Sequence, residues 1–150
     1  MSERISQDKM LMLIAGTVAM RSTCSRLPTG VGAVIARDGR VISTGYNGVP
    51  SGMEHCNHEC DCDFVHEKNC ASGPCMGAVH AEQNAIAFAA KYGLSTNGAS
   101  LYCTLAPCLG CAKLVINSGI SKVLYRSTYR DDAGCRLLID AGIEVKQFIL

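Results

Sequence analysis

The sequence predicts an α/β fold in which helices cover both faces of a single sheet. Short apolar runs rich in β-branched residues alternate with longer helical patterns along most of the chain. An Asp38-Gly39 pair separates the first two runs, as in a tight hairpin turn. The length of 150 residues fits one domain, and a hydrophobic content of 48% is enough for a buried core.

The elements follow in order. A mostly apolar helix is expected over residues 6–21, capped near Ser6, and strands over 31–36 and 41–46 flank the hairpin turn. The second half alternates helices and strands, with a glycine soon after each helix as a stop signal. We expect helices over 80–92, 107–118 and 133–141, and strands over 100–104, 122–125 and 144–148. This order predicts a mostly parallel sheet with an antiparallel pair at its start.

Charge and composition exclude several classes of protein. With 14 basic and 13 acidic residues, the formal net charge of +1 argues against a polynucleotide-binding protein. The apolar run at residues 10–20 is too short to span a bilayer, and acidic residues before it argue against an export signal. We therefore expect a cytoplasmic protein without membrane contact. In that compartment its 10 cysteines are better suited to metal binding than to disulfides.

Two short motifs indicate a catalytic zinc site. His80-Ala81-Glu82 opens one predicted helix, and Pro107-Cys108-Leu109-Gly110-Cys111 opens the next, so both are expected at the same edge of the sheet. One histidine and two cysteines leave a fourth zinc position for water. Cys108 and Cys111, three positions apart, share one helical turn, and the helix N-terminus is expected to lower the pKa of both thiols.

Glu82 adds an acid–base group to this set. Placed two residues after His80, its carboxylate can lie beside a metal-activated water and accept a proton without binding the metal. The combined pattern H-x-E…P-C-x-x-C is typical of zinc deaminases of nucleobases. A C-x-x-C pair alone would equally suit a structural zinc half-site or a redox pair, but both motifs at helix starts favour catalysis.

On these residues the chain resembles the cytidine deaminase superfamily and, within it, the deoxycytidylate (dCMP) deaminase family of viral and bacterial type. Further matching stretches are 31–35, 45–52, 80–86 and 125–129, and the second of these separates this branch from cytidine and transfer-RNA deaminases. The resemblance implies a three-layer α/β/α fold with a five-stranded mixed sheet, over a single domain of residues 1–150. It also implies hydrolysis of dCMP to dUMP and ammonia, which supplies thymidylate synthesis.

The resemblance also assigns site residues. It implies zinc ligands at His80, Cys108 and Cys111 and a proton shuttle at Glu82. Substrate contacts carried over by position are Asn47 to the sugar hydroxyl, Tyr129, Ser25 and Arg26 near the phosphate, and Ala81. The forked guanidinium of Arg26 suits a dianion. The alternatives are a turn residue in the left-handed region for Asn47, an ordinary surface tyrosine for Tyr129, and an exposed arginine without a role for Arg26.

Regulation is implied in the same way. Members of the family form homohexamers, are activated by dCTP and are inhibited by dTTP, with Mg²⁺ on the triphosphate. The residues here that resemble the effector loop are Asn47, Gly48, Ser51 and Gly52.

A cysteine- and histidine-rich loop, inserted at about residues 53–77, suggests a second metal. The resemblance implies ligands at Cys56 and Cys75, and the remaining candidates are Cys24, Cys60, Cys62, His66 and Cys70. A structural zinc would offset the ordering entropy of a loop this long without its own core. The alternative is a reduced, disordered, thiol-rich loop. Cys103 and Cys135 fall in apolar patterns and are expected in the core.

Two rival functions remain open. One is a deaminase of another cytosine compound, such as dCTP or cytidine. The other is a non-catalytic zinc protein, for instance a nucleic-acid-binding module, which has no use for Glu82 beside an open zinc position.

Overall fold

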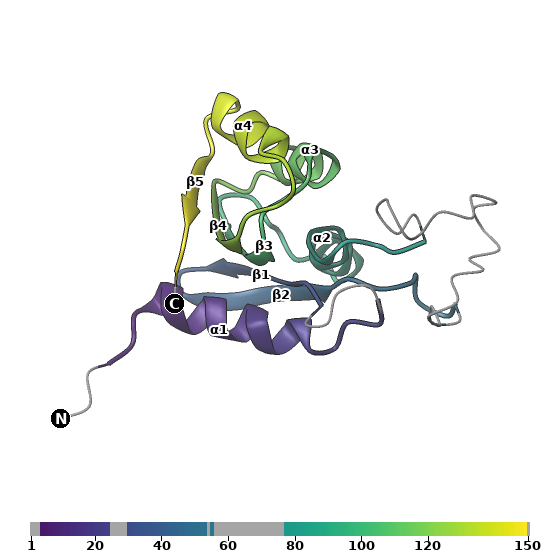
Figure 1. Cartoon of the computed structure of the whole chain (residues 1–150). Coiled ribbons are helices and arrows are strands. Elements are labelled where there is room, and N and C mark those ends of the chain that lie inside the picture. Colours follow the sequence, from purple (N-terminus) through teal and green to yellow (C-terminus); the bar gives the residue numbers. More distant parts are fainter. Residues whose placement is uncertain (1–3, 25–29, 54, 56–76, 150) are drawn as a thin grey trace.

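The computed structural model describes residues 4–24, 30–53, 55 and 77–149. In this part of the chain a five-stranded sheet carries helices on both faces (Figure 1). The elements are α1 (Gln7–Ala19), β1 (Gly32–Arg37), β2 (Arg40–Tyr46), α2 (Ala81–Lys91), β3 (Ser100–Leu105), α3 (Leu109–Asn117), β4 (Lys122–Ser127), α4 (Ala133–Asp140) and β5 (Glu144–Gln147). The predicted three-layer α/β/α class is confirmed, and each expected helix and strand lies within a few residues of its predicted position.

The strand directions differ from the prediction in one respect. The sheet order is β2-β1-β3-β4-β5, with β1 antiparallel to both β2 and β3, while β3, β4 and β5 are parallel. The crossover through α2 does keep β2 and β3 in the same direction, as expected. Because β1 lies between them, both of its pairings are antiparallel. The five-stranded mixed sheet that the resemblance implies is confirmed, whereas the mostly parallel sheet expected from the order of elements is not.

Local signals explain where the first elements begin and turn. Ser6 caps α1, since its hydroxyl oxygen accepts the Lys9 amide at 3.2 Å. At the hairpin turn Asp38 and Gly39 have φ angles of 51° and 73°, the left-handed values that a two-residue turn requires. Both predictions from the sequence are confirmed.

The sheet separates two apolar clusters. On one face, buried side chains of α2, α3 and α4 pack against the strands, and this cluster includes Ala85, Val115 and Leu138. On the other face α1 packs alone, through Leu11, Met12 and Ala15, against Val34, Tyr102 and Leu124. Figure 1 shows α1 below the sheet and the other three helices above it. Cys103 is fully buried as expected, whereas Cys135 is only partly buried.

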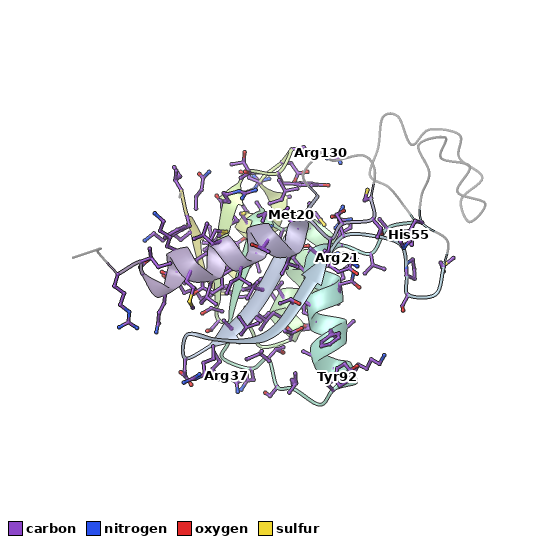
Figure 2. All side chains as sticks on the ribbon, turned by 90° about the horizontal axis from the view of Figure 1, so that it is seen from below. Met20, Arg21, Arg37, His55, Tyr92 and Arg130 are labelled. Carbon is purple, nitrogen blue, oxygen red and sulfur yellow. The ribbon has the colours of Figure 1, made fainter. Side chains whose placement is uncertain are left out.

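One end of the sheet collects the segments that carry the motifs. The first residue of β1 pairs with the last residue of β2, and β3 and β4 also end at this edge. Arg37, at the β1–β2 turn, and His55, beyond β2, lie toward opposite ends of the sheet (Figure 2). None of the described helices is long and apolar enough to cross a membrane.

Candidate metal centre

His80 is the N-cap residue of α2, and both its backbone N–H and its carbonyl have hydrogen-bond partners in the first turn of the helix. Its N–H donates to Gln83 Oε1 at 2.8 Å, and its carbonyl accepts the Asn84 N–H at 2.9 Å. The Gln83 side chain thus caps the helix start. The imidazole of His80 is therefore left to face the cysteines of α3.

A close backbone contact seats α2 on β2. A Cβ atom at Gly45 would overlap the Ala81 carbonyl oxygen and lie 2.5 Å from the Ala85 nitrogen, so only glycine permits this approach. Two side chains strengthen the contact. Ser43 Oγ donates to the Ala85 carbonyl at 2.6 Å, and Asn84 Nδ2 donates to the Tyr46 carbonyl at 2.6 Å. The first turn of α2, which carries the H-x-E motif, is held directly against the sheet.

The two cysteines approach His80 from the start of α3. Cys108 is the N-cap, so the helix begins at Leu109 rather than at Pro107 as predicted, and Cys111 is buried in the first turn. His80 Nδ1 lies 3.5 Å from Cys108 Sγ and 3.3 Å from Cys111 Sγ. All three candidate ligand atoms lie within 4.8 Å of one another. Ligands of a tetrahedral zinc with ordinary bond lengths are roughly 3.6 Å apart, so these residues fit the ion.

The pKa values of the two thiols shift in opposite directions. The Cys111 thiol donates to Cys108, and this hydrogen bond, with a further one to His80, lowers the pKa of Cys108 well below its ordinary value. The same bond, with burial, raises the pKa of Cys111. The predicted fall in pKa is therefore confirmed for Cys108 and wrong for Cys111. The hydrogen bond to Cys108 also raises the pKa of His80.

Glu82 is a buried carboxylate at this centre, with 4% of its surface exposed. Burial, which disfavours the charged form, is the largest cause of its raised pKa. The fields of His80 and of Cys108 act on it in opposite directions. A metal triangle with a protonatable group beside it is suited to hydrolytic acid–base chemistry.

The comparisons with known proteins agree with this geometry. The model of the family described as "Cytidine and deoxycytidylate deaminase zinc-binding region" matches residues 5–127. The ComE operon protein 2 of Bacillus subtilis is 40% identical over 97% of this chain and 72% of that protein. The deoxycytidylate deaminase of Saccharomyces cerevisiae is 40% identical over 97% of this chain, which spans 46% of the yeast protein.

A solved structure covers the whole fold. The dCMP deaminase of cyanophage S-TIM5, in complex with dCMP and dUMP, superposes with a TM-score of 0.81 and 31% identity, over 98% of this chain and all of that one. The chain belongs to the cytidine and deoxycytidylate deaminase family.

In this deaminase Asn47 is buried and fastens three segments. Its Oδ1 accepts the Val31 N–H at 2.7 Å, and its carbonyl accepts from Ser22 Oγ at 2.9 Å and from the Thr23 N–H at 3.2 Å. Among the described residues Asp38 is the only non-glycine with a positive φ, so the left-handed alternative for Asn47 is wrong. Among the described residues, no hydrogen bond of the Asn47 Nδ2 group is found beside that of Oδ1.

Of the other predicted substrate residues, two belong to the described part of the chain and two do not. Ala81 is the buried first residue of α2, next to His80. Tyr129 follows β4 at the edge that carries the cysteines, with the Arg130 guanidinium carbon 5.1 Å from its ring centre. Ser25 and Arg26 lie outside the described residues.

The predicted effector residues also differ among themselves. Both backbone groups of Gly48 are taken up by Val79, at 3.1 Å and 2.8 Å, and this bridge ends directly before His80. Ser51 and Gly52 are exposed in the following turn. The candidates for a second zinc lie outside the described residues, except Cys24, which is buried. Those outside are Cys56, Cys60, Cys62, His66, Cys70 and Cys75.

Two contributors to the site were not predicted from the sequence: Gln83 and Gly45. Gln83 carried a usable signal, because a glutamine three residues after a helix cap is half of a capping box. Gly45 acts through a contact between distant segments, which a single sequence does not display.

Proposed function

We propose that this protein hydrolyses dCMP to dUMP and ammonia, with a zinc ion held by His80, Cys108 and Cys111. The observation that carries the proposal is the triangle of these ligands with Glu82 buried beside it. The cyanophage relative, which binds dCMP and dUMP and spans the same fold, supports the choice of substrate.

The residues of the chain divide the work. Zinc bound here would supply Lewis acidity, which lowers the pKa of a water and stabilises negative charge as C4 of the cytosine is attacked. Glu82 takes the proton from the attacking water and delivers it to ring N3. Glu82, again a carboxylate, then takes the proton of the new C4 hydroxyl and passes it to the exocyclic amine. The bond from C4 to that amine breaks as the C4 carbonyl forms, and ammonia leaves. The raised pKa of Glu82 suits a group that must both accept and return a proton.

Substrate contacts are proposed from the position of the described residues at this end of the sheet and, for Ser25 and Arg26, from the resemblance to the family alone. We assign Asn47 Nδ2 to the sugar hydroxyl and Ala81, beside His80, to the base. Tyr129, with Ser25 and Arg26, is assigned to the phosphate. A phosphate contact would explain a preference for dCMP over cytidine.

Regulation by dCTP and dTTP, with Mg²⁺ on the triphosphate, is proposed for the loop of Asn47, Gly48, Ser51 and Gly52. The bridge from Gly48 to Val79 supports the idea, since movement of this loop would pass along two hydrogen bonds to the residue before His80. A role in supplying dUMP for thymidylate synthesis, and a cytoplasmic location, follow from the same proposal.

A homohexamer is proposed as the assembly. On α2 and just beyond it, Phe88, Tyr92 and Leu94 are 49%, 57% and 40% exposed, and the first two rings contact each other in a tilted arrangement with centroids 4.6 Å apart. Light scattering should give a mass near six times 15.9 kDa. A monomeric mass at micromolar concentration would contradict the hexamer.

The decisive experiment offers dCMP, dCTP and cytidine separately to zinc-loaded protein and measures deaminated product by chromatography. We expect dUMP from dCMP, raised by dCTP with Mg²⁺ and lowered by dTTP. Preference for dCTP or cytidine would replace the substrate but keep the chemistry. Absence of any product would leave a zinc protein without this reaction.

A further inference from the structure

Gly134 brings the backbone of α4 into contact with the segment that carries the metal-binding cysteines. It is the second residue of α4 and is buried. A Cβ atom at this position would overlap the Pro107 carbonyl oxygen and lie 2.8 Å and 2.9 Å from the carbonyl carbon and oxygen of Cys108. All three are backbone atoms, so a side chain could be fitted only if one segment moved.

The surroundings of α4 direct that movement toward the cysteines. One turn after Gly134, Leu138 is fully buried in the core, which anchors the helix against the sheet. At its start, the Ala133 N–H donates to Asp131 Oδ1 at 3.1 Å. Outward movement of α4 would therefore expose Leu138, and the Pro107–Cys108 segment is the other partner in the contact.

A displacement of the Cys108 carbonyl would move both Cys108 and Cys111. That carbonyl accepts the Ala112 N–H at 2.9 Å, which forms the first turn of α3 and includes Cys111. The sulfur atoms of the two cysteines now lie 3.5 Å and 3.3 Å from His80 Nδ1. A shift of a few tenths of an ångström changes both separations together.

We infer that Gly134 is a positioning residue, whose close contact with Cys108 sets the geometry of the two cysteine ligands relative to His80. The inference rests on the proposed zinc site, but it concerns metal binding and can be measured without the substrate. Gly134 has no side chain with which to bind a metal, so its effect would pass through Pro107 and Cys108.

The test is Gly134→Ala, with zinc affinity measured by competition with a chromogenic chelator. We expect affinity to fall by roughly tenfold to a hundredfold, as for other residues that orient metal ligands. The cobalt-substituted variant should show shifted thiolate-to-cobalt charge-transfer bands, since these report the metal–sulfur geometry. At saturating zinc, kcat for dCMP should fall while KM stays near the wild-type value.

Two controls separate positioning from general effects. Gly16→Ala also adds a methyl group to a helical glycine, but its nearest neighbour would be an Arg126 nitrogen at 3.5 Å, so there is room. Gly32→Ala creates a backbone overlap with Ala15 and Ala19 of α1, on the other face of the sheet. Gly32→Ala should lose thermal stability, yet both controls should keep wild-type zinc affinity and cobalt spectra.

Three results would overturn the inference. These are a zinc affinity of Gly134→Ala within twofold of wild type with an unchanged spectrum, a loss no larger than that of Gly32→Ala, or failure to fold even with excess zinc. The last would assign Gly134 to stability rather than to positioning. If the wild-type protein binds zinc but makes no dUMP, the proposed function fails, while the metal readouts still decide the role of Gly134.

Discussion

Glu82 combines deep burial with an ionisable group, and this combination sets what the residue can do. Only 4% of the residue is exposed to solvent, so its charged form is disfavoured and the pKa of Glu82 is raised. A surface glutamate would hold its proton far less readily near neutral pH. Burial beside His80, rather than the residue type alone, makes Glu82 suitable for proton transfer.

We expect Glu82→Gln to reduce kcat by roughly 10²- to 10⁴-fold, the usual contribution of general acid–base catalysis. Glutamine matches the shape of glutamate but cannot accept the proton. Zinc content, measured by atomic absorption, and the thermal unfolding curve should stay near those of wild type. Turnover close to the wild-type value would rule out the proton-transfer role of Glu82.

At the scale of single elements, a buried hydroxyl fastens α1 to the sheet. Tyr102 on β3 is 4% exposed, and its hydroxyl donates to Asp8 Oδ1, in the first turn of α1, at 2.7 Å. Burial, together with the hydrogen bond and the charge of Asp8, raises the pKa of Tyr102. Folding therefore favours the neutral phenol.

Tyr102→Phe should lower the free energy of unfolding by about 1 kcal/mol, because it removes one hydrogen bond and keeps the ring. This corresponds to a fall in Tm of about 3 °C for a chain of this size. Tyr92→Phe is the matched control, because it also keeps the ring and removes one hydroxyl, here from a side chain that is 57% exposed in the single chain. Its Tm should fall less than that of Tyr102→Phe.

The pH dependence of this contribution has a definite sign. A pKa raised in the folded state gives stability that is fully present below the unfolded pKa of about 10 and is lost as pH rises above it. The Tm difference between wild type and Tyr102→Phe should therefore shrink above about pH 10. A Tm difference that grows with pH would contradict a neutral, hydrogen-bonded Tyr102 hydroxyl in the folded state.

For the whole molecule, the metal is expected to contribute to stability as well as to chemistry. A ligand that binds only the folded state at about a thousand times its Kd adds about 4 kcal/mol. Chelation of zinc should thus lower Tm by roughly 10 °C and abolish activity, and zinc but not Mg²⁺ should restore both. Glu82→Gln serves as the control, because its Tm should fall on chelation although it has little activity to lose. An unchanged Tm after complete removal of zinc would contradict this coupling.

Local chemistry made the helices, strands and hairpin predictable. Ser6 caps a helix and Asp38 and Gly39 form a turn, and each does so through contacts within a few residues. The two metal motifs are likewise defined by short spacings in the sequence. The insertion of β1 between β2 and β3 was not predicted, because strand neighbours depend on packing between distant segments. The pKa of Cys111 was mispredicted for a related reason, since its hydrogen bond to Cys108 and its burial raise that pKa, whereas the fall predicted for Cys108 is confirmed.

Burial likewise separated residues that look alike in sequence. Cys103 and Cys135 both occur in apolar patterns, but only Cys103 is fully enclosed. Asn47 was predicted to contact the sugar hydroxyl of the substrate or to be a turn residue. In the structure its side-chain Oδ1 accepts the Val31 N–H and so joins two segments of the fold.

The central place of β3 has a consequence for the time at which this protein matures. Strand β3 lies between β1, made earlier, and β4, made later, so the hairpin of β1 and β2 leaves the ribosome with its inner edge unpaired. A two-stranded hairpin is at best marginally stable alone, and an open edge invites pairing with other chains. Because the last candidate ligand is Cys111, the metal centre cannot form until β3, the partner of that edge, has been made. In a growing chain, capture of the ion would therefore mark the end of the period of greatest exposure to aggregation.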